Sequence, residues 1–162
     1  MKNREHLSLY GVGPIYGGVV IAVTALSILL THTGIVPAVR YGGFSGMTAL
    51  LGAALIVAGV WLWYCAVFRA KVDDHIKSNT LATDGAYAWV RNPIYSAILM
   101  ACLGALLLAN NLWLLILPPL YWLFLTVLLK HTEEKWLLAL HGKKYAEYCK
   151  RVNRCIPWPP GK

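Results

Sequence analysis

The sequence has little charge, and long parts of it have none. Only 14% of the 162 residues are Asp, Glu, Lys or Arg, whereas 58% are apolar. Three segments, 7–39, 41–68 and 94–129, contain no charged residue at all. A helix that crosses a bilayer needs about 20 consecutive apolar residues. This distribution is unusual for a soluble domain and predicts an all-α integral membrane protein.

Several signatures of other protein classes are also missing. The four cysteines, Cys65, Cys102, Cys149 and Cys155, lack the close pairing of a metal site, which favours reduced thiols. The segment 11–14 has no Lys, Ser or Thr of a phosphate loop, so we interpret it as a flexible lead-in to the first span. No cleavage pattern follows the first apolar run, which favours a retained signal anchor. His131 and Glu134 have a spacing compatible with a metal, but two ligands do not make a site, and none is predicted.

The uncharged segments predict four spans, at 14–36, 44–68, 94–109 and 112–129. The third segment is long enough for two helices if it turns at Asn110–Asn111, a pair favoured in turns. These last two spans are short, so we expect a tight hairpin that either crosses at a tilt or is re-entrant. Pro118–Pro119 should kink its second arm. We expect a single membrane domain, 1–162, in which 1–69 form a scaffold and 70–162 the catalytic region. Small residues in the second span should let helices approach closely: Gly52, Ala53, Ala58 and Gly59.

The basic residues lie almost entirely on one side of these spans. Arg40 alone falls on the other side, whereas basic residues before span one, between spans two and three, and after span four share one compartment. This asymmetry predicts that both termini and the middle loop are cytoplasmic. The net charge of +8 is therefore explained by topology and anionic lipid rather than by nucleic acid.

Polar and aromatic residues gather in two cytoplasmic segments, 69–95 and 130–160, and we expect the functional site there. Arg91 and Asn92 precede Pro93 at the predicted start of span three, where free backbone donors favour anionic groups. Glu133 and Glu134 lie only a few residues beyond an apolar run, so each needs a ligand or a cationic partner. The candidate partners are Lys130, Lys135, Arg151 and Arg154.

The end of the chain also has an amphipathic pattern. Its apolar positions, Trp136, Leu137, Leu140, Tyr145 and Tyr148, predict a helix that lies against the membrane surface. The following residues, 151–160, would then fold back over the site. This gives a cytoplasmic C-terminal helical segment that covers a pocket.

Two blocks of residues together carry a family resemblance. The first contains Thr80, Leu81, Thr83, Gly85, Tyr87, Arg91, Pro93 and Tyr95, and the second, about forty residues later, contains Glu133, Glu134, Leu137, Gly142, Tyr145, Tyr148, Arg151, Val152 and Pro157. In order and spacing, these blocks resemble the isoprenylcysteine carboxyl methyltransferase family, which is related to membrane phospholipid methyltransferases. The resemblance covers residues 79–158, about half of the chain.

The resemblance implies S-adenosyl-L-methionine as the methyl donor, with S-adenosyl-L-homocysteine as its product. It implies a pocket that faces the cytoplasm under the tail and opens sideways to the bilayer. The family's cofactor contacts fall on Asn79, Thr80, Leu81, Ala82, Tyr87, Asn92, Pro93, Ile94, Tyr95 and Glu133. The donor carries an ammonium, a sulfonium and a carboxylate, which suits a carboxylate, amide donors and aromatic faces. The candidate catalytic residues are Arg91, Tyr95, Glu134 and Arg154.

Two positions depart from the family's pattern. Asn92 stands where the family commonly has His, which keeps hydrogen bonding but removes a titratable group. Leu129 stands where the prenylcysteine enzymes have an Arg attributed to the substrate, so the acceptor could differ. The implied reaction is an in-line displacement by a lipophilic nucleophile that enters from the bilayer. An anionic nucleophile needs no base, whereas an amine or alcohol would need one, with Glu134, Tyr95 or His131 as candidates.

Several alternatives stay open on the sequence alone. The acceptor could be a prenylcysteine, a phospholipid, or another small lipophilic amine or thiol. The chain could instead be an NADPH-dependent reductase of the sterol type, or a non-catalytic assembly or channel subunit. The glutamates could pair with Lys130 and Lys135 on a solvated helix. The aromatic residues could form an interfacial belt: Tyr87, Trp89, Trp136 and Trp158. The sequence predicts no oligomeric state.

Overall fold

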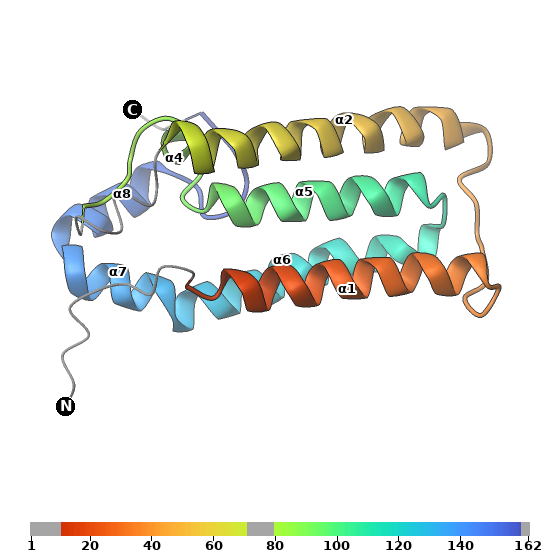
Figure 1. The fold of residues 1–162 in the computed structure, drawn as a ribbon, viewed down its shortest axis with the longest axis horizontal. Coiled ribbons are helices and arrows are strands. Elements are labelled where there is room, and N and C mark those ends of the chain that lie inside the picture. The colour runs from red at the N-terminus through yellow and green to blue at the C-terminus, as the bar shows by residue number, and fades with distance from the viewer. Residues whose placement is uncertain (1–10, 71–79, 160–162) are drawn as a thin grey trace.

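The computed structural model describes residues 11–70 and 80–159, and every regular element in these ranges is helical. Four long helices run side by side (Figure 1): α1 (Gly13–His32), α2 (Ser45–Tyr64), α5 (Pro93–Leu108) and α6 (Leu117–His131). Short segments extend them: η1 (Gly42–Phe44) precedes α2, the π-helical η2 (Cys65–Arg69) follows it, and the 3-10 helix η3 (Leu112–Ile116) precedes α6. Three small helices lie at one end of the bundle: α4 (Ala86–Trp89), α7 (Glu133–His141) and α8 (Lys143–Arg151).

Three helical stretches are long and apolar enough to cross a membrane: Gly13–His32, Gly42–Arg69 and Leu112–His141. The prediction of an all-helical membrane protein is therefore confirmed for the part of the chain that the structure describes. The helix α5 is apolar but has only 16 residues. At 1.5 Å per residue it is about 24 Å long, shorter than a bilayer core of about 30 Å. The fourth span thus stays a prediction.

Glycines set the distance between α2 and α5. A Cβ at Gly52 would lie 2.7 Å from the carbonyl oxygen of Gly104, and a Cβ at Gly104 would lie 2.5 Å from that of Gly52. A Cβ at Gly59 would lie 2.8 Å from the carbonyl oxygen of Ala97 in α5. The predicted close approach is confirmed at these two α2 glycines. Ala53 and Ala58 are exposed, so the prediction is wrong for them because they lie on the outer face of α2.

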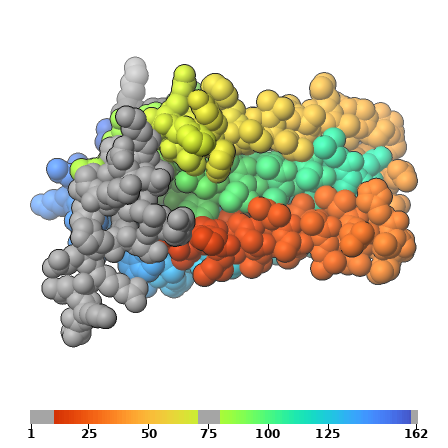
Figure 2. All heavy atoms as spheres, viewed as in Figure 1, coloured from red at the N-terminus to blue at the C-terminus, as the bar shows by residue number. Residues whose placement is uncertain are grey.

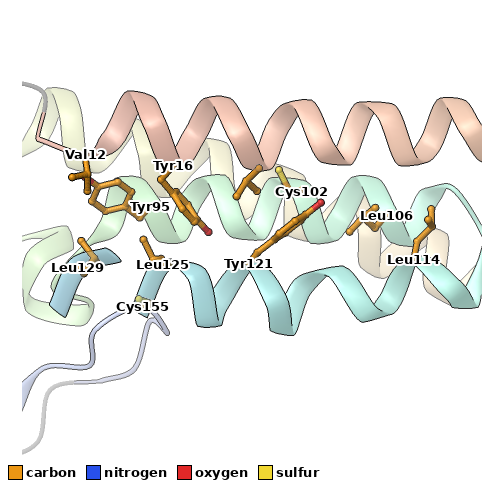
Figure 3. Close-up of a cluster of buried hydrophobic side chains, with 11 residues drawn as sticks. Val12, Tyr16, Tyr95, Cys102, Leu106, Leu114, Tyr121, Leu125, Leu129 and Cys155 are labelled. Carbon is orange, nitrogen blue, oxygen red and sulfur yellow. The ribbon is translucent and has the colours of Figure 1, made fainter. Parts of the chain in front are cut away.

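The buried core lies between α1, α5 and α6 (Figure 3). It contains Val12, Tyr16, Val20, Tyr95, Cys102, Leu106, Leu114, Tyr121, Leu125, Leu129 and Cys155. The hydroxyls of Thr24 and Tyr121 are 3.0 Å apart and join α1 to α6 inside the bundle. Leu129 is fully buried in this core, so a charged side chain would have no water at that position. The long helices form adjoining bands on the surface of the molecule (Figure 2). Many of their large apolar side chains are exposed, as lipid contact requires.

A buried amide ties the loops together at the end of the bundle away from α7 and α8. Asn110 has a positive φ of 52°, so the predicted turn at this pair is confirmed. The amide of Asn111 donates to Thr31 Oγ1 and to the carbonyl of Pro37, and its oxygen accepts from the backbone N–H groups of Val39 and Trp113. All four groups lie within 3.3 Å of the Asn111 amide atoms that they bind. The loop after α1 is thereby bound to the α5–α6 turn.

The two prolines after this turn lie at the start of a helix rather than in its interior. Pro118 and Pro119 follow the first residue of α6, Leu117, and stand in its first turn. A proline ring in the first turn removes no helix hydrogen bond, since those N–H groups have no partner within the helix. The helix changes from η3 to α6 directly before these prolines, and the kink predicted at this pair stays a prediction.

Candidate active site

The two motif segments meet at one end of the bundle, where α5 begins and α6 ends (Figure 1). The backbone N–H of Arg91 donates to the carbonyl of Asn153 over 2.8 Å. The side-chain amide of Asn92 donates to the carbonyl of Arg154 over 3.0 Å. Asn92 is also the residue before α5, so the start of this helix is fixed directly to the tail. The predicted return of the tail over this segment is confirmed at these contacts.

Further hydrogen bonds join the tail to the segment around the start of α5, and we call this row of bonds the seam. Ser96, fully buried in the second turn of α5, donates from Oγ to the carbonyl of Cys155 over 2.7 Å. The hydroxyl of Tyr148 donates to the carbonyl of Tyr87 over 2.6 Å. The tail therefore covers the segment that precedes α5 from α8 onwards.

An ion cluster lies beneath this seam. Nε and a terminal nitrogen of Arg154 bind the two carboxylate oxygens of Glu134 at 2.6 and 3.0 Å. Arg91 approaches the same carboxylate at 3.2 Å, and its side chain is only 8% exposed. Two arginines thus share one glutamate, which leaves a net charge of +1 on the cluster. In the described residues Glu134 pairs with Arg91 and Arg154, rather than with Lys130 or Lys135 on a solvated helix face.

Residues of α8 complete the surroundings of Arg91. One terminal nitrogen lies 3.5 Å from the hydroxyl of Tyr145 and also contacts Sγ of Cys149. The Nε of Arg91 is buried and has no partner among the described residues. Burial raises the pKa of the Tyr145 and Tyr148 phenols, more than the neighbouring Arg91 lowers it. Both phenols are therefore neutral at physiological pH and can donate hydrogen bonds.

The expected surface helix takes another form. The chain turns at Gly142, whose φ is +52°, so that α7 and α8 are separate helices. Tyr145 and Tyr148 are buried in a cluster with Val152, against which Leu81 packs. The prediction that these tyrosines face the membrane surface is wrong, because their apolar face is covered by protein.

Glu133 has a different environment from its neighbour. Its Oε1 accepts a hydrogen bond from the backbone N–H of Val12 at 2.8 Å and another from the hydroxyl of Tyr95 at 2.5 Å. Figure 3 shows Val12 and Tyr95 next to each other between α1 and the end of α6. Both donors are neutral, and among the described residues no Lys or Arg pairs with Glu133. This carboxylate is thus held in position, while no cation in the described part of the chain balances its charge.

The other candidate cofactor residues line the same end of the bundle. Asn92, Pro93, Ile94 and Tyr95 form the start of α5, and Leu81 and Ala82 are half-buried before it. Thr80 is exposed, and Tyr87 is half-buried in α4. Asn79 lies outside the described residues. Their contacts with a cofactor stay a prediction.

Sequence reasoning missed several residues that the structure brings to the site. Cys149 joins Tyr145, Tyr148 and Val152 at spacings of three and four residues, a helical periodicity that marks one face of α8. Val12 gave no such signal, because a backbone N–H carries no residue-type signature.

Comparison with known proteins agrees with these observations. The family described as phospholipid methyltransferase matches residues 47–144. Among curated proteins, protein-S-isoprenylcysteine O-methyltransferase of Schizosaccharomyces pombe is 36% identical over 85 residues, which are 52% of this chain and 36% of the relative. The enzymes of the same name from Xenopus laevis and Homo sapiens are 31% and 30% identical, and each match covers 70% of this chain and 42% of the relative.

The chain spans only about two fifths of the length of these relatives. No solved structure matches it. The resemblance to the isoprenylcysteine carboxyl methyltransferases is nevertheless confirmed by several relatives of that name. Since the family match extends over more than half of its residues, this integral membrane protein belongs to the phospholipid methyltransferase family.

Proposed function

We propose that this chain is an S-adenosyl-L-methionine-dependent methyltransferase of the membrane, acting on a lipophilic acceptor that reaches the site from the bilayer. The observation that carries the proposal is the carboxylate of Glu133, which is held by two neutral donors and has no cationic partner among the described residues. A carboxylate in partly buried surroundings is costly without a cation, so this position favours a cationic ligand. The names of the relatives support a methyl transfer.

The charges of the site fit the donor. When bound, S-adenosyl-L-methionine supplies an activated methyl group on a sulfonium. Glu133 would hold its ammonium through Oε2, because both described hydrogen bonds go to Oε1. The excess positive charge of the Arg91–Glu134–Arg154 cluster would hold its carboxylate or an anionic group of the acceptor. The predicted contacts from 79–82, Tyr87 and 92–95 would surround the rest.

The residues around these charges position the carboxylate of Glu133 and exclude water. Tyr95 keeps Glu133 in place by donating its hydroxyl proton to Oε1, and the seam from Arg91 to Cys155 keeps water from the buried side of the cluster. Because both oxygens of Glu134 already accept from Arg154, this carboxylate is poorly placed to receive a proton from an amine or alcohol acceptor.

The surroundings of Leu129 bear on how the head group of an acceptor would be held. Its burial in the apolar core leaves no charge at the position where the prenylcysteine enzymes have an Arg. An anionic head group would therefore depend on Arg91 and Arg154. We propose a lipophilic acceptor with such a head group, a class that includes both prenylcysteine and phospholipid.

The proposal includes the orientation of the protein. With α5 as a fourth span, the site, the middle loop and both termini lie on the cytoplasmic side. Arg69 ends η2, Arg91 precedes α5, and further basic residues follow α6, so all of these lie at the site end. Arg40 lies in the loop between α1 and η1, at the other end. This asymmetry supports the orientation.

Titration calorimetry on the protein in detergent tests the proposal. S-adenosyl-L-methionine should bind, and Glu133→Ala should abolish binding, while Glu147→Ala on the exposed face of α8 should not change it. Folded protein that takes up no S-adenosyl-L-methionine would refute the proposal. Binding of NADPH in its place would favour a reductase. Transfer of a radiolabelled methyl group to prenylated cysteine or to phospholipid would then distinguish the acceptors.

A further inference from the structure

Gly11 lies in contact with the carboxylate of Glu133, although 122 positions separate the two residues in the sequence. Gly11 has a φ of +49°, and a Cβ built on it would overlap Oε1 of Glu133. The same Cβ would lie 3.0 Å from the Cδ of Glu133 and 3.6 Å from the Tyr95 hydroxyl. Only a residue without a side chain leaves this carboxylate where it is.

The next residue supplies a bond to the same oxygen. The N–H of Val12, the residue before α1, donates to Oε1 over 2.8 Å. Val12 is 7% exposed, so the bond is shielded from water. It also lies at the positive end of the α1 dipole, which stabilises a negative charge there. This segment therefore holds Glu133 both by shape and by charge.

The first turn of α1 encloses the other donor. A Cβ on Gly13 would lie 3.6 Å from the Tyr95 hydroxyl, and the ring of Tyr16 packs edge-on against the Tyr95 ring at 5.7 Å. Tyr95 thus reaches Glu133 through a gap that small residues of α1 leave open. The phospholipid methyltransferase match begins at residue 47, so it assigns no role to this part of the chain.

We infer that the segment Gly11–Val12 is a positioning element of the donor site, which sets Glu133 to receive the ammonium of S-adenosyl-L-methionine. The inference rests on the proposed function. It replaces the interpretation of this segment as a flexible lead-in to the first span. Gly11 and Val12 are positioning residues, since they act through Glu133.

The test compares two glycine variants that both place an alanine at a positive φ. Gly11→Ala adds strain at positive φ and displaces Glu133. Gly34→Ala adds strain at a φ of +78°, but a Cβ there has nothing within 4 Å. Each protein is titrated with S-adenosyl-L-methionine, with S-adenosyl-L-homocysteine and with methylthioadenosine, which lacks the ammonium and the carboxylate. Thermal unfolding of both variants is measured in the same detergent.

Gly11→Ala should weaken binding of S-adenosyl-L-methionine and S-adenosyl-L-homocysteine about tenfold or more, because a bond to a charged group is lost. Methylthioadenosine should bind Gly11→Ala and wild type equally, and Gly34→Ala should match wild type with all three compounds. Binding of S-adenosyl-L-methionine to Gly11→Ala within twofold of Gly34→Ala would overturn the inference. So would an equal loss for methylthioadenosine, which would mean general damage. Failure of the proposed function is distinct, since wild-type protein would then bind none of the three.

Discussion

Glu134→Gln removes the negative charge that separates two guanidinium groups. In the wild type the cluster has one carboxylate and two arginines, with a net charge of +1, and Glu134 lies 2.6 Å from Arg154 and 3.2 Å from Arg91. The variant raises the net charge to +2 and removes the carboxylate that both arginines contact in the described structure. The exposed fractions of the three side chains are 8%, 16% and 24%, so water screens the repulsion only in part.

The size of the effect follows from burial. Removing one partner of a buried ion pair costs about 3–5 kcal/mol. Because this cluster is partly exposed, we expect a loss of about 3 kcal/mol in the free energy of unfolding. Arg154→Gln leaves the Arg91–Glu134 pair intact and lowers the cluster charge to zero, so it should cost only about 1 kcal/mol. The order of the two variants is the distinctive part of this prediction.

Equilibrium unfolding in mixed detergent micelles, followed by tryptophan fluorescence, measures these differences. Glu147→Gln, on the exposed face of α8, is the matched control for loss of one acidic charge and should stay within about 0.5 kcal/mol of wild type. The reasoning is refuted if Arg154→Gln costs as much as Glu134→Gln, or if Glu134→Gln unfolds like the control.

Three further predictions concern packing, a buried amide and a thiol. Gly104→Ala should destabilise the protein by about 1–3 kcal/mol, because its Cβ would meet the carbonyl of Gly52 at 2.5 Å. Gly46→Ala, with nothing within 4 Å, is its control, and equal unfolding of the two variants would contradict the packing. Asn111→Ala should lower the free energy of unfolding by about 2 kcal/mol or more, since it leaves the buried partners of the amide unpaired. An unchanged free energy of unfolding would contradict this and would mean that water replaces the amide. Burial raises the pKa of the Cys155 thiol to about 12, so maleimide should not label it at pH 8 in folded protein, as mass spectrometry would show; rapid labelling would contradict its burial.

Local chemistry explains what could be predicted from the sequence. Asn110 takes a left-handed conformation for the same reason that Asn favours turns, so the hairpin turn was predictable. The uncharged segments defined the long helices because a bilayer core accepts few charges. The meeting of the two motif blocks could be expected only through the family resemblance, since the blocks lie about forty residues apart.

Long-range partners were not predictable in the same way. Sequence reasoning named Arg154 among the candidate partners of the glutamates, and its contact with Glu134 is confirmed. The second partner of Glu134, Arg91, lies 43 residues earlier in the chain and was not among those candidates. The apolar face of α8 was visible as a pattern, but a pattern does not say whether lipid or protein covers it, and Tyr145 is covered by protein. The role of Gly11 depends on a single close approach in space, which no composition or period encodes.

The four hydrogen bonds of Asn111 hold the loop after α1 at one end of the bundle, whereas the N–H of Val12 ties the start of α1 to Glu133 at the other end. Helix α1 has 20 residues and is about 30 Å long. A tilt of about 5° about the Asn111 anchor would move the opposite tip of α1 by about 2.6 Å. That displacement is nearly the length of the Val12–Glu133 hydrogen bond. Small rocking of one helix, with no unfolding, is thus enough to release or seat the carboxylate.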